Sequence, residues 1–255
     1  MNNKVTLNIW VTGASSGIGK ALVEQLDRQG HHVYASARNE EALANLVDSG
    51  KGNITAVPCD VSNDAAMAKV LQSNGLESLD TIFLCAGTCE YINMPDLDIN
   101  MIRRVADTNY FGLVNSCIAA FPLLKKSKYR PHIVGIGSMS SYLGFPRAEA
   151  YGSSKAAMSY FLDSLRCDLK GEMDVTVVYP GFIKTPMTDT NDFPMPFLMS
   201  VEKAASVILK KAHNRPLTIS FPTRLHILLQ TMKMIPGLWY STIAKRLSRA
   251  QEAQL

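Results

Sequence analysis

The segment that decides the fold is Thr12-Gly-Ala-Ser-Ser-Gly-Ile-Gly19, which lies between the apolar run 7–12 and a helical pattern at 19–29. Glycine has no Cβ, so the turn can be tight, and its backbone N–H groups and the helix N-terminus can hold a pyrophosphate. The spacing is G-x-x-x-G-x-G and differs from the G-x-G-x-x-G that is usual in dinucleotide-binding turns. A strand, this turn and a helix in succession predict a dinucleotide site that includes Gly13, Ser15, Ser16, Gly17, Ile18 and Gly19.

Short apolar runs alternate with helical patterns along the rest of the chain. The expected strands are 7–12, 32–36, 54–59, 81–85, 132–137, 175–179 and 217–221. The expected helices are 19–29, 40–49, 64–73, 101–124, 151–170 and 201–213. Strands that are separated by long helices pair in parallel through right-handed crossovers. We therefore predict an α/β fold, a doubly wound parallel sheet of the Rossmann type with helices on both faces, in a single domain over residues 1–255.

The composition is that of an ordinary globular protein. Of the 255 residues, 47% are hydrophobic and 19% are charged, and no run reaches the roughly 18 apolar residues of a membrane span. We expect no secretory leader, because residues 1–4 lead directly into the first strand. The net charge of +4 is uneven, since residues 201–255 hold nine Lys or Arg against two Asp or Glu. The basic residues lack an interleaved aromatic platform or a recognition motif, so we expect no nucleic-acid partner.

The cysteines are odd in number and lack the paired C-x-x-C spacing of a zinc site. We expect buried or half-buried free thiols in a reducing cytoplasm and no metal. The five residues are Cys59, Cys85, Cys89, Cys117 and Cys167.

The end of the second expected strand predicts which dinucleotide binds. NAD-binding proteins usually have an acid there that binds the ribose hydroxyls, but this chain has Ser36-Ala-Arg-Asn39 and no acid before Glu40. The guanidinium of Arg38 can pair with a 2′-phosphate that a carboxylate would repel, so NADP(H) is favoured over NAD(H). The alternative is that Arg38 is a solvated surface residue. After the third expected strand, Asp60 (followed by Val61) could bind the adenine amino group.

A phenol and an ammonium group lie one helical turn apart in the expected helix 151–170, at Tyr151 and Lys155. Tyrosine has a reference pKa of about 10, and a neighbouring lysine cation favours the phenolate and lowers that pKa. Ser138 follows the strand 132–137 and would point into the crevice at the carboxyl edge of the sheet. Its hydroxyl can hydrogen-bond a carbonyl oxygen that gains negative charge. These residues predict acid–base chemistry on a carbonyl or alcohol; the alternative is a chance pair on a surface helix.

With these motifs in place, the chain resembles the short-chain dehydrogenase/reductase family over residues 5–190. The resemblance rests on the glycine turn 12–19, Asp60, Cys85-Ala-Gly87, Asn109, Ser138, Tyr151 with Lys155, and Pro180-Gly181 through Thr185. One departure is Leu84-Cys85 before Ala86-Gly87, where the family usually has two asparagines. This puts in doubt a local hydrogen bond that stabilises the sheet, not the chemistry.

The resemblance implies a catalytic tetrad of Asn109, Ser138, Tyr151 and Lys155. In this tetrad Tyr151 donates the proton during reduction, and Ser138 positions the carbonyl. Lys155 binds the ribose and tunes Tyr151, while Asn109 holds a water that relays protons to Lys155. The resemblance also implies cofactor contacts by Tyr151 and Lys155 and by Ala86, Gly87, Pro180, Gly181, Ile183 and Thr185.

The function that follows is an NADP(H)-dependent oxidoreductase that interconverts a ketone or aldehyde and the matching alcohol by hydride transfer. Two alternatives stay open: a non-catalytic NADP(H)-sensing binding module, and an NAD-dependent alcohol dehydrogenase of the same family. The helices 101–124 and 151–170 resemble the pair that forms dimer interfaces in this family, so a homodimer or tetramer is expected.

Two segments beyond the cofactor and catalytic core (5–190) differ in composition. Residues 186–200 correspond to the family's substrate flap, and their Met, Phe and Pro content predicts an apolar cover and a lipophilic substrate. The alternative is that they pack the edge of the domain. Residues 222–255 form a basic amphipathic segment, which can make a peripheral contact with an anionic membrane surface. The alternative is that this segment covers the substrate cleft or a partner subunit.

Overall fold

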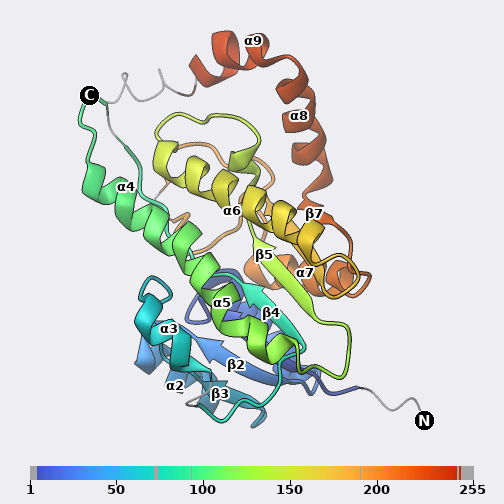
Figure 1. Ribbon diagram of the computed structural model, residues 1–255. Coiled ribbons are helices and arrows are strands. Elements are labelled where there is room, and N and C mark those ends of the chain that lie inside the picture. The colour runs from blue at the N-terminus through green and yellow to red at the C-terminus, as the bar shows by residue number, and fades with distance from the viewer. Residues whose placement is uncertain (1–4, 72–73, 93, 190, 246, 248–255) are drawn as a thin grey trace.

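The computed structural model describes residues 5–71, 74–92, 94–189, 191–245 and 247. Seven parallel strands form a sheet in the order β3-β2-β1-β4-β5-β6-β7 (Figure 1). The strands are β1 (Asn8–Thr12), β2 (His32–Ser36), β3 (Ile54–Ala56), β4 (Thr81–Leu84), β5 (His132–Ile136), β6 (Asp174–Pro180) and β7 (Thr218–Phe221). The strand order reverses beside β1, so the connections after β1 and β4 leave in opposite directions and form a crevice at the carboxyl edge of the sheet.

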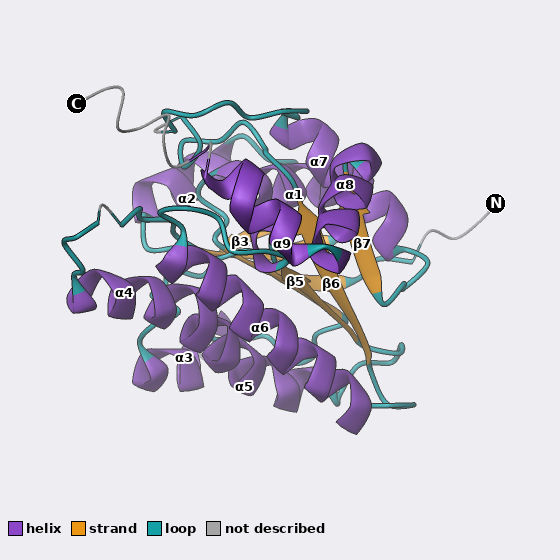
Figure 2. Ribbon diagram, turned by 90° about the horizontal axis from the view of Figure 1, so that it is seen from above, coloured by secondary structure: helices purple, strands orange, loops and turns teal. Residues whose placement is uncertain are grey.

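Helices cover both faces of the sheet. Figure 2 shows α1, α2 and α7 on one face and α3, α4, α5 and α6 on the other. Their bounds are α1 (Gly17–Arg28), α2 (Glu40–Asp48), α3 (Asp64–Val70), α4 (Ile99–Ala106), α5 (Gly112–Leu124), α6 (Glu149–Asp168) and α7 (Val201–Ala212). The predicted doubly wound parallel fold is therefore confirmed.

The sheet separates two apolar cores, because successive side chains of a strand point to opposite faces. Trp10 of β1 is paired in register with Ile82 of β4, and both belong to the core beneath α5 and α6. The next pair, Val11 and Phe83, belongs to the core beneath α1 and α7. Because both faces are buried, these strands are continuously apolar instead of alternating with polar residues.

Three predicted elements have different bounds in the structure. The third strand ends at Ala56 instead of residue 59, where Pro58 has no N–H for the ladder. The helix predicted at 64–73 extends to Val70, and its predicted end at Ser73 lies outside the described residues. The helix predicted at 101–124 begins at Ile99 and is interrupted by a π-helical turn at Asp107–Phe111. The other predicted ends differ from the observed ones by two residues or fewer.

The C-terminal segment folds into helices over the carboxyl edge of the sheet: α8 (Thr223–Met234), α9 (Pro236–Leu238) and a π-helical turn at Trp239–Ile243 (Figure 1). Leu225, Leu229 and Trp239 are buried, and Trp239 Nε1 donates a hydrogen bond to the carbonyl oxygen of Gly144 at 2.9 Å. This packing supports the alternative in which the segment covers the cleft. Arg246 and Arg249, which add to its predicted basic character, lie outside the described residues. Within the described ranges, no helix combines the length and apolarity that crossing a membrane requires.

Candidate functional site

The turn between β1 and α1 requires glycine at two positions. Gly13 has φ +67°, and a Cβ on it would lie 2.7 Å from the backbone nitrogen of Ala86. A Cβ on Gly19 would overlap the carbonyl oxygen of Gly13. The turn is therefore packed closely against the loop that follows β4, and it presents backbone rather than bulky side chains at the start of α1.

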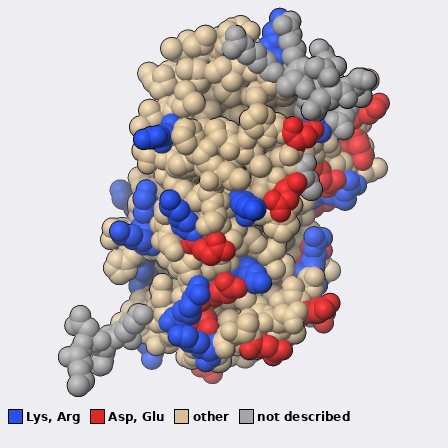
Figure 3. Space-filling view, turned by 180° about the vertical axis from the view of Figure 1, so that it is seen from behind, with Lys and Arg blue, Asp and Glu red and all other residues tan. Residues whose placement is uncertain are grey.

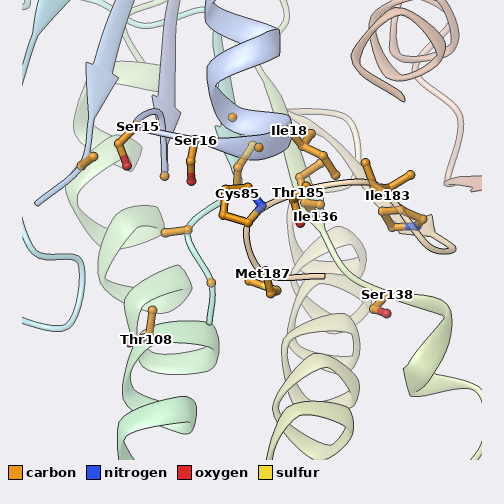
Figure 4. Close-up of a pocket in the computed structure, with 18 of the residues that line it drawn as sticks. Ser15, Ser16, Ile18, Cys85, Thr108, Ile136, Ser138, Ile183, Thr185 and Met187 are labelled. Carbon is orange, nitrogen blue, oxygen red and sulfur yellow. The ribbon is translucent and has the colours of Figure 1, made fainter. Parts of the chain in front are cut away.

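A cleft of about 290 Å³ opens at this turn and extends along the carboxyl edge of the sheet to α6. In Figure 4, Ser15 and Ser16 lie in the turn before α1, Ile18 lies beside Thr185 and Ile183, and Ser138 lies at the far end. The structure brings every cofactor-binding residue predicted from the sequence to the wall of this cleft. These residues are Gly13, Ser15, Ser16, Gly17, Ile18, Gly19, Arg38, Asp60, Val61, Ala86, Gly87, Tyr151, Lys155, Pro180, Gly181, Ile183 and Thr185.

The loop after β4 is fastened to β1 despite the cysteine at position 85. Thr12 Oγ1 accepts hydrogen bonds from the backbone nitrogens of Cys85 at 3.1 Å and Ala86 at 3.2 Å. Burial raises the pKa of the Cys85 thiol to about 12, so it is neutral at physiological pH. The hydroxyl of Thr12 thus holds the loop without the amide side chains that the resemblance led us to expect.

Arg38 and Asp60 lie near each other at the rim of the cleft, next to β2 and β3. Arg38 is exposed, and its charge is close enough to act on the Asp60 carboxylate. Burial alone would raise the pKa of Asp60. Hydrogen bonds from the Ser62 backbone N–H at 2.9 Å and from its hydroxyl at 2.7 Å, together with the charge of Arg38, lower the pKa by more. The pKa of Asp60 is lowered as a result, so the rim carries the Asp60 carboxylate beside the Arg38 side chain.

Ser138, Tyr151 and Lys155 meet at the inner end of the cleft. Ser138 follows β5, Tyr151 and Lys155 lie on α6, and Ser138 is close enough to Tyr151 to lower its pKa. Lys155 Nζ lies 6.0 Å from the centroid of the Tyr151 ring and donates to the carbonyl oxygen of Ile136 at 2.8 Å. Ser138 Oγ accepts from the backbone nitrogen of Ser140 at 3.1 Å and its hydroxyl at 3.0 Å. These bonds leave the Ser138 hydroxyl hydrogen free to be donated.

Burial controls the protonation of Tyr151 and Lys155. Burial and the nearby Cys89 thiol raise the pKa of Tyr151 to about 12, and the Ser138 side chain offsets this only in part. Burial lowers the pKa of Lys155 to about 8, with Cys85 and Cys89 opposing it. The prediction that Lys155 lowers the pKa of Tyr151 is therefore wrong in its net direction, because desolvation dominates. At neutral pH the phenol carries its proton and the ammonium group is mostly charged.

Asn109 lies in the π-helical turn and is buried beside Lys155. Its Oδ1 accepts from the Thr88 backbone nitrogen at 2.7 Å, and its Nδ2 donates at 2.9 Å to the Thr88 carbonyl and to Ser154 Oγ. A Cβ on Gly87 would lie 3.2 Å from both Asn109 Oδ1 and Lys155 Nζ. The amide therefore connects the loop after β4 to α6 at the catalytic end of the cleft. Its role in holding a water stays a prediction.

An apolar cavity of about 310 Å³ adjoins the cleft and shares Ser138 and Tyr151 with it. Its walls come from the loop after β5, the flap segment 186–200, α8 and the π-helical turn after α9. The apolar side chains in these walls include Phe145, Phe182, Phe193, Leu225, Leu229, Trp239 and Ile243. The two hydroxyls thus lie where a polar cleft and an apolar cavity meet.

Side-chain contacts hold the flap segment over this cavity. Tyr91 donates a hydrogen bond to Asn191 Oδ1 at 2.6 Å, and its ring meets the edge of Phe193. Arg147 Nη1 lies 3.0 Å from both carboxylate oxygens of Asp192, and the guanidinium carbon lies 5.1 Å from the centroid of the Tyr91 ring. The flap is therefore tied to the loops that follow β4 and β5.

Sequence reasoning missed Cys89, Tyr91, Phe145 and Arg147, which all line the apolar cavity. They lie in loops without a recognisable motif. The signal that could have found them is their position after β4 and β5, because ligands in such sheets bind beyond the carboxyl ends of the strands.

The cysteines form no metal site in the part of the chain that the structure describes, where no group of three or more His, Cys, Asp or Glu could bind a metal. Cys117 is buried, and Cys59, Cys85 and Cys89 are half-buried. Cys167 is exposed near the end of α6, so the prediction that every thiol is shielded is wrong for this residue.

The chain is similar to known oxidoreductases over most of its length. A family model described as short chain dehydrogenase matches residues 7–193. An uncharacterized oxidoreductase of Myxococcus xanthus is 35% identical over 243 residues, which are 93% of this chain and 96% of that protein. The 11-beta-hydroxysteroid dehydrogenase A of Sesamum indicum is 34% identical over 185 residues, which are 70% of this chain and 53% of that protein.

Two solved structures are also similar. The closed form of a serine dehydrogenase complexed with NADP+ superposes with a TM-score of 0.76 at 26% identity, covering 84% of this chain and 94% of that one. A short chain dehydrogenase/reductase from Burkholderia phymatum in complex with NAD gives a TM-score of 0.82 at 20% identity, covering 93% and 96%. The second likeness supports the fold.

Proposed function

The chain belongs to the short-chain dehydrogenase family, and from this premise we propose that it is an NADP(H)-dependent oxidoreductase that interconverts a lipophilic carbonyl compound and its alcohol. The observation that carries the proposal is the position of Ser138 and Tyr151, which line both the glycine-lined cleft and the apolar cavity that adjoins it. A cofactor in the cleft and a substrate in the cavity would both reach these hydroxyls.

The residues of the cleft fit a dinucleotide. Side chains are excluded at Gly13 and Gly19, so a pyrophosphate can approach the start of α1, and Gly87 keeps the space beside Lys155 open. Arg38 at the rim would pair with a 2′-phosphate, which supports NADP(H), and the similar serine dehydrogenase was solved with NADP+. When bound, the cofactor supplies or accepts the hydride.

The protein's own part in the chemistry is to hold and move one proton. Tyr151 is a neutral phenol at physiological pH, because burial raises its pKa to about 12, so it can donate to a carbonyl oxygen during reduction. Ser138 has a hydroxyl hydrogen left to donate to that oxygen or to the Tyr151 oxygen that loses its proton. The Lys155 ammonium, held by the Ile136 carbonyl, would favour the phenolate once Tyr151 has given up its proton.

The lining of the apolar cavity supports a lipophilic substrate. Apart from the groups near Ser138 and Tyr151 and those that tie down the flap, its walls are aromatic and aliphatic side chains. Each Å² of apolar substrate surface that the cavity removes from water adds roughly 25 cal/mol to the binding free energy. The relative from Sesamum indicum is named for a hydroxysteroid, which is a molecule of this kind.

The test is a panel of carbonyl compounds and alcohols assayed with NADPH and with NADH in parallel. We expect higher kcat/KM with NADPH and with bulky apolar ketones than with small hydrophilic ones. Arg38→Asp should lower kcat/KM for NADPH about 10–100-fold, the loss expected for a charge-assisted bond of about 1.5–3 kcal/mol, and should spare NADH. Arg103→Asp, on the exposed side of α4, is the matched control. A preference for NADH in the unmodified protein would contradict the role of Arg38.

We also propose that the chain assembles as a homodimer through α5 and α6. The support is a set of large apolar side chains that these helices and the preceding π-helical turn leave exposed: Phe111, Ile118 and Tyr160. Ile118→Asp should convert the assembly to monomers in light scattering. A wild-type protein that is monomeric at assay concentration would contradict the proposal.

A further inference from the structure

The C-terminal helices have one apolar face turned inward and a second apolar face turned outward. The inner residues Leu225, Leu229 and Trp239 are buried. On the outside, Met234 is 84% exposed and Ile227 is 59% exposed. We call the outer set the C-terminal face; its residues are Ile227, Leu228, Met234, Ile235, Leu238 and Tyr240. A stretch this rich in exposed apolar side chains is unusual on a monomer surface and marks an interaction site.

Between Glu202 and Glu252 the C-terminal segment carries charge of a single sign. Arg224, Lys233 and Lys245 are exposed along the same segment, and the chain has no Asp or Glu between Glu202 and Glu252. On the side of the molecule that Figure 3 shows, most Lys, Arg, Asp and Glu lie over the lower part, and few are visible at the upper end. The face is thus apolar, and all the charged side chains that its own segment supplies are basic.

The C-terminal face is continuous with the apolar cavity. Leu228 is 48% exposed and also lines the cavity, next to Leu225 and Leu229 on the same helix. A lipophilic molecule at the outer face would therefore meet the cavity rim at Leu228 without crossing a polar surface.

We propose that the C-terminal face docks the protein onto the surface of an anionic lipid bilayer. Its apolar side chains would enter the boundary between headgroups and acyl chains, and its basic residues would lie against the anionic headgroups. A second copy fits the face less well, because a two-fold interface would bring the same unbalanced cations together. The proposal goes beyond the oxidoreductase function and does not depend on it.

The test is co-sedimentation of the full chain with phosphatidylcholine vesicles, with and without phosphatidylserine. We expect binding only when phosphatidylserine is present, and loss of binding at about 1 M salt, where the Debye length falls to about 3 Å. Replacing Arg224, Lys233 and Lys245 by Glu should weaken binding by at least about 100-fold. The matched control replaces Lys125, Lys126 and Lys128, which carry the same charge near the amino end of β5, by Glu. It should leave binding nearly unchanged.

A second pair of variants tests the apolar part of the contact. Met234→Glu with Ile235→Glu should abolish binding, whereas Leu217→Glu, whose exposure of 64% lies between those two but which stands at the opposite end of β7, should not. Tyr240→Trp is a conservative probe: brominated lipids should quench its fluorescence, but not that of Tyr160→Trp on α6. The native Trp10 and Trp239 are buried and set the background.

Three results would overturn the proposal. The first is no sedimentation with anionic vesicles at low salt. The second is an equal loss of binding in the Arg224, Lys233 and Lys245 variant and in the Lys125, Lys126 and Lys128 variant, which would indicate that net charge alone drives binding. The third is absence of lipid quenching at Tyr240→Trp together with dissociation of an oligomer by Met234→Glu and Ile235→Glu, which would assign the face to a second copy.

Discussion

Replacing the buried Lys155 by Met should stabilise the protein at neutral pH in the absence of cofactor, even though it removes a proposed site residue. Burial lowers the pKa of Lys155 from 10.5 to about 8. This difference corresponds to about 3 kcal/mol of folding free energy that the buried charge costs at pH 7, at about 1.4 kcal/mol per pKa unit. Met has a similar volume and no charge, so it removes this cost.

The gain is reduced by one lost hydrogen bond. Lys155 Nζ donates to the carbonyl oxygen of Ile136 at 2.8 Å, and leaving that carbonyl unsatisfied costs about 1–3 kcal/mol. The net stabilisation of Lys155→Met at pH 7 is therefore about 1 kcal/mol. Above the folded-state pKa of about 8 the unfolded chain binds one more proton than the folded protein, so the wild type gains stability as pH rises. By about pH 9.5 this gain reaches about 2 kcal/mol, and the variant becomes the less stable protein.

The assay is urea unfolding of both proteins without cofactor at neutral pH and near pH 9.5. Lys170→Met, just beyond the end of α6, removes an exposed lysine and should show no comparable change with pH. A stability difference between Lys155→Met and wild type that stays the same at both pH values would refute the reasoning. So would an advantage of the variant that grows with pH.

Two further substitutions test the glycine turn and the flap. Gly13→Ala forces a Cβ to within 2.7 Å of the Ala86 backbone at φ +67°, so it should lower stability by about 2–4 kcal/mol and weaken NADPH binding. Gly30 has φ +81°, but a Cβ there would meet no atom within 4 Å, so Gly30→Ala should lower stability by only about 1 kcal/mol. Equal drops in melting temperature for the two alanine variants would contradict a clash at Gly13. Asp192→Asn weakens the contact with Arg147 that holds the flap, and should raise KM for an apolar ketone several-fold with little change in kcat, as steady-state kinetics can show. A fall in kcat with KM unchanged would argue against a role in closing the cavity.

The sequence predicts the sheet and the cleft well, because the signals involved are local. Ile9, Trp10 and Val11 are consecutive apolar residues, which is what a strand buried on both faces requires. Gly13 and Gly19 occupy positions that exclude any Cβ, so the residue type itself records the geometry. Tyr151 and Lys155 lie four residues apart, and helical periodicity alone brings them to one face.

What the sequence does not predict depends on contacts between distant segments. The bond from Tyr91 to Asn191 joins residues 100 positions apart, and no spacing rule relates them. Asn109 in the π-helical turn is hydrogen-bonded to Thr88, 21 positions away, and the apolar pattern of the helix does not indicate this contact. The pKa of Tyr151 was predicted in the wrong direction because the neighbouring charge is visible in the sequence, whereas the extent of burial is not.

The central claim is that Tyr151 moves the proton in an NADP(H)-dependent reaction, and Tyr151→Phe tests it most directly. The variant removes one oxygen and keeps the ring, so NADPH affinity measured by cofactor fluorescence should stay close to that of the wild type. With the best ketone of the panel, kcat should fall by about 10²–10⁴-fold, the usual contribution of a general acid. Turnover at the wild-type rate in Tyr151→Phe, with NADPH still bound, would contradict the account.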